Sequence, residues 1–166
     1  VYSKEELAGL AEVLAKHPQV MVISDEIYEH ITYGGKHESI AQFPEVREQV
    51  VIVNGVSKAY AMTGWRIGFI AGPEWVVKAV NKLQGQYTSG PCSVSQKAAE
   101  AAYTGTQAPV EEMRTAFERR RNLIVELAKS WFGVYSFTKV LFPIPIIQSI
   151  PQTIAEWIFA VYVLGI

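Results

Sequence analysis

The chain has 166 residues, 49% of them hydrophobic and 19% charged, which is the composition of a folded globular domain rather than of a disordered segment. Its formal net charge of -1 excludes the strongly basic surface that draws a protein to nucleic acid or to an anionic membrane. The single cysteine excludes an internal disulfide framework and a cysteine-rich zinc site, and the three histidines lack the spacing of metal ligands.

The first half of the chain predicts one helix followed by two buried strands. Ser3 and Glu6 have the spacing of a helix-capping box, and apolar residues then recur at helical spacing until Pro18 ends the pattern. The apolar runs 20–23 and 50–53 are typical of strands that are covered on both faces, as in a parallel sheet. Polar residues follow each run, so they are expected at the carboxyl ends of the two strands.

The second half predicts a third, shorter strand at 66–71 and then helices at 74–84 and 93–103. A long helix is expected from 109 to about 129, since apolar residues repeat along one face of it. Helices that alternate with buried strands indicate an α/β layer architecture.

Beyond residue 130 the sequence is apolar and is interrupted by prolines. The stretch 153–166 is short for a membrane span and contains Glu156, so membrane insertion is not expected. We expect this tail either to be buried or to result from an altered reading frame or splice.

The chemistry concentrates in segment 55–68, GVSKAYAMTGWRIG, which begins just after the second strand. The Lys58 amine can condense with an aldehyde if a partly buried, electropositive site lowers its pKa. Ser57 and Arg66 can hold a phosphate. Pyridoxal phosphate carries both groups, so the segment predicts a Schiff-base site for this cofactor. An exposed loop lysine and a surface arginine are the alternatives.

Asp25 follows the first strand and Lys58 follows the second, and ligands of open α/β sheets bind beyond the carboxyl ends of the strands. We therefore expect both residues to face one crevice. Asp25 would keep the ring nitrogen of the cofactor protonated, and Tyr28 would hydrogen-bond the ring hydroxyl. A helix N-cap is the alternative role for Asp25, and ordinary packing is the alternative for Tyr28.

These segments resemble the fold-type I pyridoxal-phosphate aminotransferases of class I/II, and especially the aspartate aminotransferase branch. Segment 55–68 agrees with the family pattern small-x-Ser-Lys, five residues, Gly-x-Arg-x-Gly, and segment 24–29 is similar to the family's aspartate-tyrosine segment. The resemblance implies an incomplete large domain with a three-layer, mostly parallel sheet. Residues 1–108 would be its carboxyl-terminal part, 109–129 a long interdomain helix, and 130–166 a divergent apolar tail in place of the small domain.

The resemblance implies a role for each matching residue. Lys58 would be the Schiff-base lysine and proton shuttle, and Asp25 and Tyr28 would complete the catalytic set on the cofactor ring. Ser57 and Arg66 would hold the phosphate. The implied reaction moves an amino group between an amino acid, with aspartate favoured, and a 2-oxo acid. A homodimer is implied for the full-length family, with no nucleic acid partner and a cytoplasmic location, while an organelle stays open.

The chain also departs from the family pattern. Val1 falls just after the position of the family's Asn-Pro-Thr-Gly motif, and 130–166 contains no arginine that could bind a substrate carboxylate. We therefore expect a fragment with low or no activity alone. A fold-type I enzyme of another reaction, such as a lyase, and a truncated non-catalytic interaction protein are the alternatives.

Overall fold

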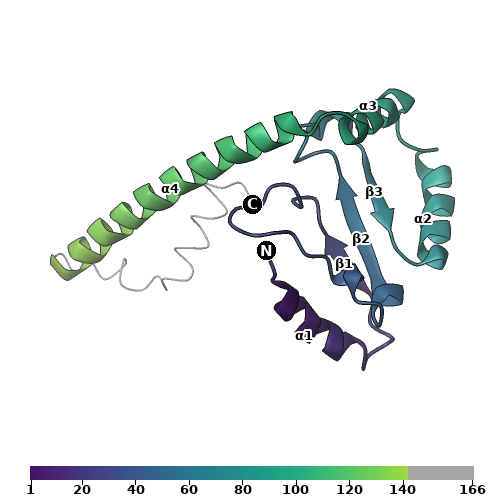
Figure 1. Cartoon of the computed structure of the whole chain (residues 1–166), viewed down its shortest axis with the longest axis horizontal. Helices are drawn as coiled ribbons and strands as arrows, with labels where there is room; N and C mark the ends of the chain where they lie inside the picture. The colour runs from purple at the N-terminus through teal and green to yellow at the C-terminus, as the bar shows by residue number, and fades with distance from the viewer. Residues whose placement is uncertain (142–166) are drawn as a thin grey trace. The chain divides into compact units, whose positions relative to one another are not determined.

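The computed structural model describes residues 1–141, with side chains for residues 1–130. Two compact units divide the chain, Val1–Glu118 and Arg119–Ile166. The first unit contains three strands, β1 (Val22–Asp25), β2 (Val50–Gly55) and β3 (Gly68–Ala71). Its helices up to residue 104 are α1 (Lys4–Leu14), α2 (Glu74–Tyr87), α3 (Ser93–Thr104) and the short 3₁₀ helices η1 (Ile40–Gln42), η2 (Arg47–Gln49) and η3 (Thr63–Trp65) (Figure 1).

The helix α4 (Ala108–Leu141) begins in the first unit and continues into the second. It starts close to the predicted position, but its backbone passes the expected end near Lys129 and stays helical to Leu141. The first part of the predicted apolar tail is therefore helical, and the rest of that tail lies outside the described residues. Within residues 1–141, no helix is both long enough and apolar enough to cross a membrane.

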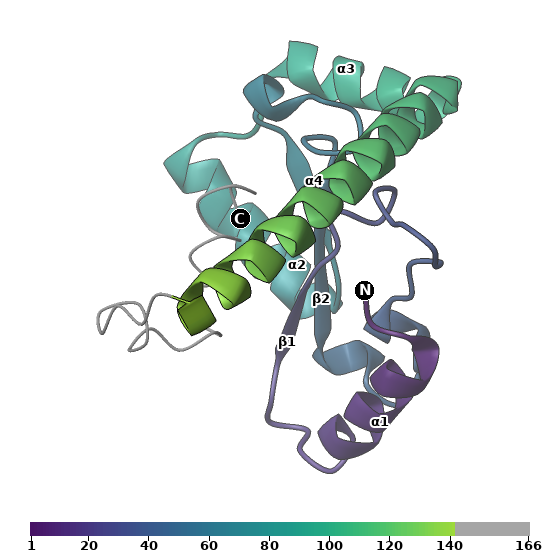
Figure 2. The same cartoon turned by 90° about the vertical axis from the view of Figure 1, so that its left-hand side faces the viewer.

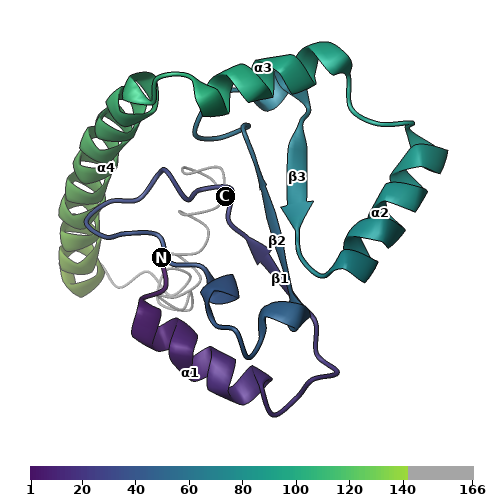
Figure 3. The same cartoon turned by 45° about the vertical axis from the view of Figure 1, so that its right-hand side comes forward.

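The strands form one sheet in the order β1-β2-β3. β1 runs parallel to β2, with Val22 opposite Val50 and Asp25 opposite Val53, whereas β3 runs antiparallel to β2. The views in Figures 1 and 3 place α1 on the β1 side of this sheet and α2 on the β3 side. The carboxyl ends of β1 and β2 and the start of β3 therefore meet at one edge of the sheet.

Coverage of the sheet differs from the prediction. β2 is the central strand and is buried at both of its ends, as its continuous apolar run predicts. β1 alternates half-buried and exposed residues, and Ile23 is 75% exposed. The expectation that the first strand is covered on both faces is wrong for the described residues, because Ile23 and Asp25 point to a face that is left uncovered. Figure 2 shows β1 beside β2.

Two strand positions also shift. The first strand begins two residues later than predicted and includes Asp25, which was expected just beyond it. The third strand begins at Gly68, because Arg66 has left-handed backbone angles, φ 51° and ψ 53°, which an extended strand does not accept.

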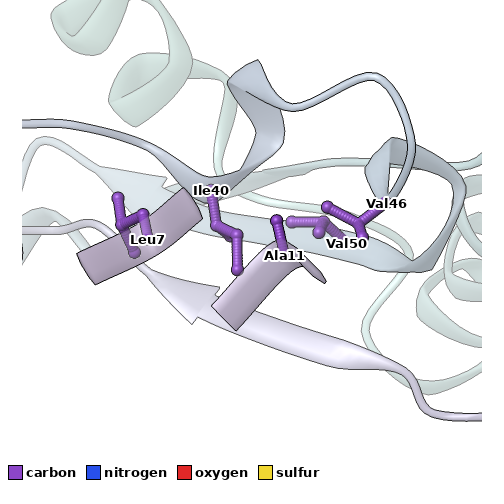
Figure 4. Close-up of a cluster of buried hydrophobic side chains, with 5 residues drawn as sticks. All are labelled: Leu7, Ala11, Ile40, Val46 and Val50. Atoms are coloured by element: carbon purple, nitrogen blue, oxygen red, sulfur yellow. The ribbon is translucent and has the colours of Figure 1, made fainter. Parts of the chain in front are cut away.

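The core lies between α1, β2 and the segment that connects β1 to β2. Its buried cluster consists of Leu7, Ala11, Ile40, Val46 and Val50 (Figure 4). The predicted capping box starts α1: the Glu6 backbone N–H donates to Ser3 Oγ at 3.2 Å, and the Ser3 N–H donates to Glu6 Oε2 at 2.7 Å. Capping and burial of one helical face together hold α1 against the sheet.

Candidate functional site

The predicted site residues come from the sheet edge at which β1 and β2 end. Asp25 is the last residue of β1, and Lys58 lies in the turn that follows β2. Val56 and Ala59 in this turn are buried, and the Ala61 N–H donates to the Lys58 carbonyl at 3.2 Å. Buried residues on both sides of Lys58 thus anchor the turn and direct the lysine outward.

Lys58, in the turn after β2, lies close to Tyr28, in the segment after β1. The Lys58 Nζ lies 5.6 Å from the centroid of the Tyr28 ring, which is cation–π distance. The structure therefore brings together two residues that the sequence assigns to the cofactor separately. The partly buried lysine expected from the sequence is wrong for the described residues, because the Lys58 side chain is exposed.

Asp25 is exposed, and its Oδ1 accepts a hydrogen bond of 3.3 Å from the Ile27 N–H. This contact stabilises a local turn, so the aspartate has the backbone-capping geometry of its alternative role, although no α-helix follows. Asp25 and Tyr28 also line a cleft of about 430 Å³ beside α1. Lys58, Ser57 and Arg66 are not among the residues that line this cleft.

Arg66 and Ser57 stand at opposite ends of the turn region. The Arg66 Nη1 donates to the Thr63 carbonyl at 3.0 Å, which uses one of the five guanidinium N–H donors, and the side chain is exposed. Its left-handed backbone costs about 1–3 kcal/mol for a non-glycine residue, and Ala61 also has a positive φ, 53°. Strained positions of this kind cluster at functional loops, so their presence supports a functional role for this segment.

The backbone at the base of the loop is in close contact. A Cβ added at Gly55 would lie 2.9 Å from the Gly68 Cα and 3.0 Å from the Ile67 carbonyl oxygen. Gly55 and Gly68 face each other in the antiparallel ladder. Two motif glycines thus close the loop that carries Ser57, Lys58 and Arg66.

Tyr60, in the turn that carries Lys58, connects this turn to α3. Its hydroxyl donates to Gln107 Oε1 at 2.9 Å, and its ring lies edge-on to Tyr103, with centroids 5.2 Å apart. Burial and the nearby Glu29 charge raise the pKa of Tyr60, and burial is also the first cause that raises the pKa of Tyr103. The aromatic pair ties the Lys58 turn to α3.

Sequence reasoning missed two buried polar groups at this edge. Asn54 is buried in β2, where its Nδ2 donates to Glu29 Oε1 at 2.8 Å and its Oδ1 accepts from the Gly55 N–H at 2.7 Å. Glu26 is buried directly beside the exposed Asp25. The position of Glu26 next to Asp25 at the end of β1 was a signal, but two of its partners, His37 and Ser39, lie on the loop that follows.

The donor set at the edge fits pyridoxal phosphate in kind. It offers an amine for an aldehyde, a carboxylate for a pyridine nitrogen, and a phenol for a ring hydroxyl. A guanidinium and a serine hydroxyl suit a phosphate. Among residues 1–130 there is no cluster of three metal-ligating side chains.

Comparison with known proteins shows that most of the chain is similar to aminotransferases. The sequence model of the family described as aminotransferase class I and II matches residues 1–149, so the match reaches into the segment 130–166 that was expected to diverge. Aspartate aminotransferase from Geobacillus stearothermophilus is 55% identical over 128 residues, which cover 76% of this chain and 32% of that enzyme. Aspartate aminotransferase from Pinus pinaster is 48% identical over 139 residues, which cover 81% of this chain and 28% of that enzyme.

Solved structures of aminotransferases also resemble this chain. Aspartate aminotransferase from Rhizobium meliloti superposes with a TM-score of 0.74 at 45% identity, over 76% of this chain and 32% of that one. Aromatic aminotransferase from Pyrococcus horikoshii gives a TM-score of 0.72 at 40% identity, over 76% of this chain and 34% of that one. The chain thus spans about one third of the length of these relatives. The predicted fold class, an incomplete fold-type I α/β domain, is confirmed, and the chain belongs to the aminotransferase class I and II family.

Proposed function

We propose that this chain carries the cofactor-binding segment of a pyridoxal-phosphate-dependent aminotransferase that moves an amino group between an amino acid and a 2-oxo acid. The observation that carries the proposal is the approach of the Lys58 amine to the Tyr28 ring at the sheet edge where Asp25 also ends its strand. Aspartate is the favoured amino acid, because the bacterial and plant relatives described above are named aspartate aminotransferase.

Each residue has its own role in this proposal. Lys58 would hold the cofactor aldehyde and carry the proton of the substrate α-carbon, while Asp25 would keep a proton on the ring nitrogen. Tyr28 orients the ring through its hydroxyl group. Ser57 and Arg66 hold the phosphate with a hydroxyl and a guanidinium. When bound, the cofactor supplies a protonated ring that withdraws electrons from the substrate α-carbon.

The proposal separates cofactor binding from turnover. The chain spans about one third of its relatives, so we expect turnover by this chain alone to be low or absent. A homodimer of the full-length protein and a cytoplasmic location belong to the same proposal. Cofactor capture at Lys58 is the property that this segment can show by itself.

The test is chemical labelling. The purified chain is incubated with pyridoxal phosphate, reduced with borohydride and mapped by mass spectrometry, and we expect a pyridoxyl group on Lys58. Lys58→Ala removes the label, whereas Lys78→Ala, at an exposed lysine on α2, leaves it unchanged. Label scattered over many lysines would contradict the proposal. If turnover is measurable, product release without a 2-oxo acid acceptor would exclude transamination in favour of a lyase.

A further inference from the structure

Glu26 is a buried carboxylate beside the proposed cofactor site. Only 6% of the residue is exposed, and three side chains bind its two oxygens. Ser24 Oγ and Ser39 Oγ donate to Oε1 at 2.9 and 2.6 Å, and His37 Nε2 lies 3.0 Å from Oε2. Removing a carboxylate from water costs several kcal/mol unless such donors replace the water, so the arrangement is a built one.

The backbone of Glu26 is part of the turn that presents Asp25 and Tyr28. Its N–H donates to the Val53 carbonyl at 2.9 Å, which holds the Asp25–Val53 pair at the end of the β1–β2 ladder. Its carbonyl accepts the Glu29 N–H at 3.0 Å and so closes the turn that contains Tyr28. Successive residues of a strand point to opposite faces, so a Glu26 side chain held inward directs Asp25 outward.

The far side of the cluster is tied to the core. Ser39 Oγ accepts the Ala41 N–H at 3.2 Å and caps η1, where Ile40 is a member of the buried cluster around α1. The Glu26 carboxylate therefore connects the end of β1 to the packed core through Ser39. The His37 ring nitrogen Nε2, 3.0 Å from Glu26 Oε2, adds a contact from the loop that follows β1.

We propose that Glu26 is a positioning residue for the cofactor site: held by Ser24, His37 and Ser39, it fixes the turn that presents Asp25 and Tyr28 to the cofactor ring. This inference rests on the proposed function, because it assigns a task toward the same cofactor. It adds a residue whose contribution runs through the backbone rather than through contact with the ring.

The first arm of the test uses the chain without cofactor. Glu26→Ala removes the three hydrogen bonds, and amide exchange read by NMR should become faster at Glu29 and Ile31, whose N–H groups close this turn, than in the wild type. Exchange in β3 should stay unchanged. Glu45→Ala, at an exposed glutamate in the following loop, is the matched control and should change neither.

The second arm measures how much pyridoxal phosphate is needed to label half of Lys58. We expect Glu26→Ala to raise this concentration about tenfold, because the turn loses the hydrogen bonds that the buried carboxylate accepts. Glu26→Gln keeps the size and the Oε1 acceptor, so it should label nearly as well as the wild type. If Glu26→Ala does not fold, Ser24→Ala removes one of the bonds and should shift the concentration in the same direction by less.

The outcomes are distinct. Faster exchange at the turn together with weaker labelling and rescue by glutamine supports the inference. A wild type that is labelled at Lys58 and a folded Glu26→Ala that is labelled equally well overturn the positioning role and leave the proposed function standing. If Glu26→Ala lowers the urea concentration at the midpoint of unfolding but changes neither amide exchange at the turn nor labelling of Lys58, the glutamate is merely structural. That result also overturns the positioning role. A wild type without label at Lys58 overturns the proposed function and, with it, any positioning toward the cofactor.

Discussion

At the scale of single residues, the glycines of the lysine segment differ in what they do. Gly55 stands where a side chain has no room, because Gly68 and Ile67 approach it at the base of the loop. Gly85, in α2, has nothing within 4 Å of its missing Cβ. The same substitution at the two positions therefore separates a steric requirement from the general flexibility of glycine.

We expect Gly55→Ala to lower the free energy of unfolding by about 1–3 kcal/mol, since an added methyl group overpacks the strand pair. Gly85→Ala should instead raise it by about 0.5–1 kcal/mol, because alanine favours the helix. Urea unfolding measures both. Equal effects at the two positions would contradict the steric role of Gly55, and Gly55→Ala should also weaken labelling of Lys58.

The site could be predicted in part at this scale. Asp25 and Lys58 were expected to share one crevice, because each follows one of two neighbouring parallel strands. The cleft that Asp25 lines does not include Lys58, and the approach of Lys58 to Tyr28 was not predicted. Glu26 was not found, because the histidine and one serine that bind it lie 11 and 13 residues away on a loop without periodic pattern. The exposure of Lys58 was also missed, since burial depends on neighbours that the motif does not contain.

At the scale of elements, periodicity predicted the helices better than the strands. α1 has a capping box and a repeating apolar face, so both its start and its buried side follow from local sequence. An apolar run such as 20–23 indicates a strand but does not say where pairing begins or what covers it. β1 is accordingly shifted along the chain and leaves Ile23 exposed.

The two leucines of α1 test its buried face. Leu7 is 6% exposed and belongs to the core, whereas Leu10 on the same helix is 45% exposed. Leu7→Ala should lower the free energy of unfolding by about 2–5 kcal/mol, because it leaves a cavity beside Ile40 and Val50. Leu10→Ala should cost much less. A similar loss for both in urea unfolding would show that α1 packs differently.

At the scale of the whole described unit, one group of aromatic and acidic side chains connects distant segments. Tyr60 follows the Lys58 turn, Tyr103 lies on α3, and Phe69 lies on β3, with 6.0 Å between the Phe69 and Tyr103 ring centroids. Glu29, which comes from the segment after β1, contributes to the raised pKa of both tyrosines. Ionisation of these tyrosines should therefore change the free energy of unfolding of the whole unit.

We expect alkaline pH to destabilise the chain through these tyrosines. Both have folded-state pKa values above their ordinary value of 10.0, so the unfolded chain releases these protons first. The stability they contribute is complete below about pH 10 and is lost as pH rises through the folded pKa values. Urea unfolding at a series of alkaline pH values should show this fall, and Tyr60→Phe should make it shallower. An unchanged slope in the variant would contradict the assignment to Tyr60.

The contact between Gly55 and Gly68 has a consequence for how this family can be engineered. The loop that carries Ser57, Lys58 and Arg66 leaves the sheet at Gly55 and returns at Gly68, and these two residues are partners in one ladder. Both ends of the loop are thus fixed at the same point. We expect the loop to be exchangeable as a single cassette between relatives, with its amine and guanidinium moving together and the register of the strands left as it was.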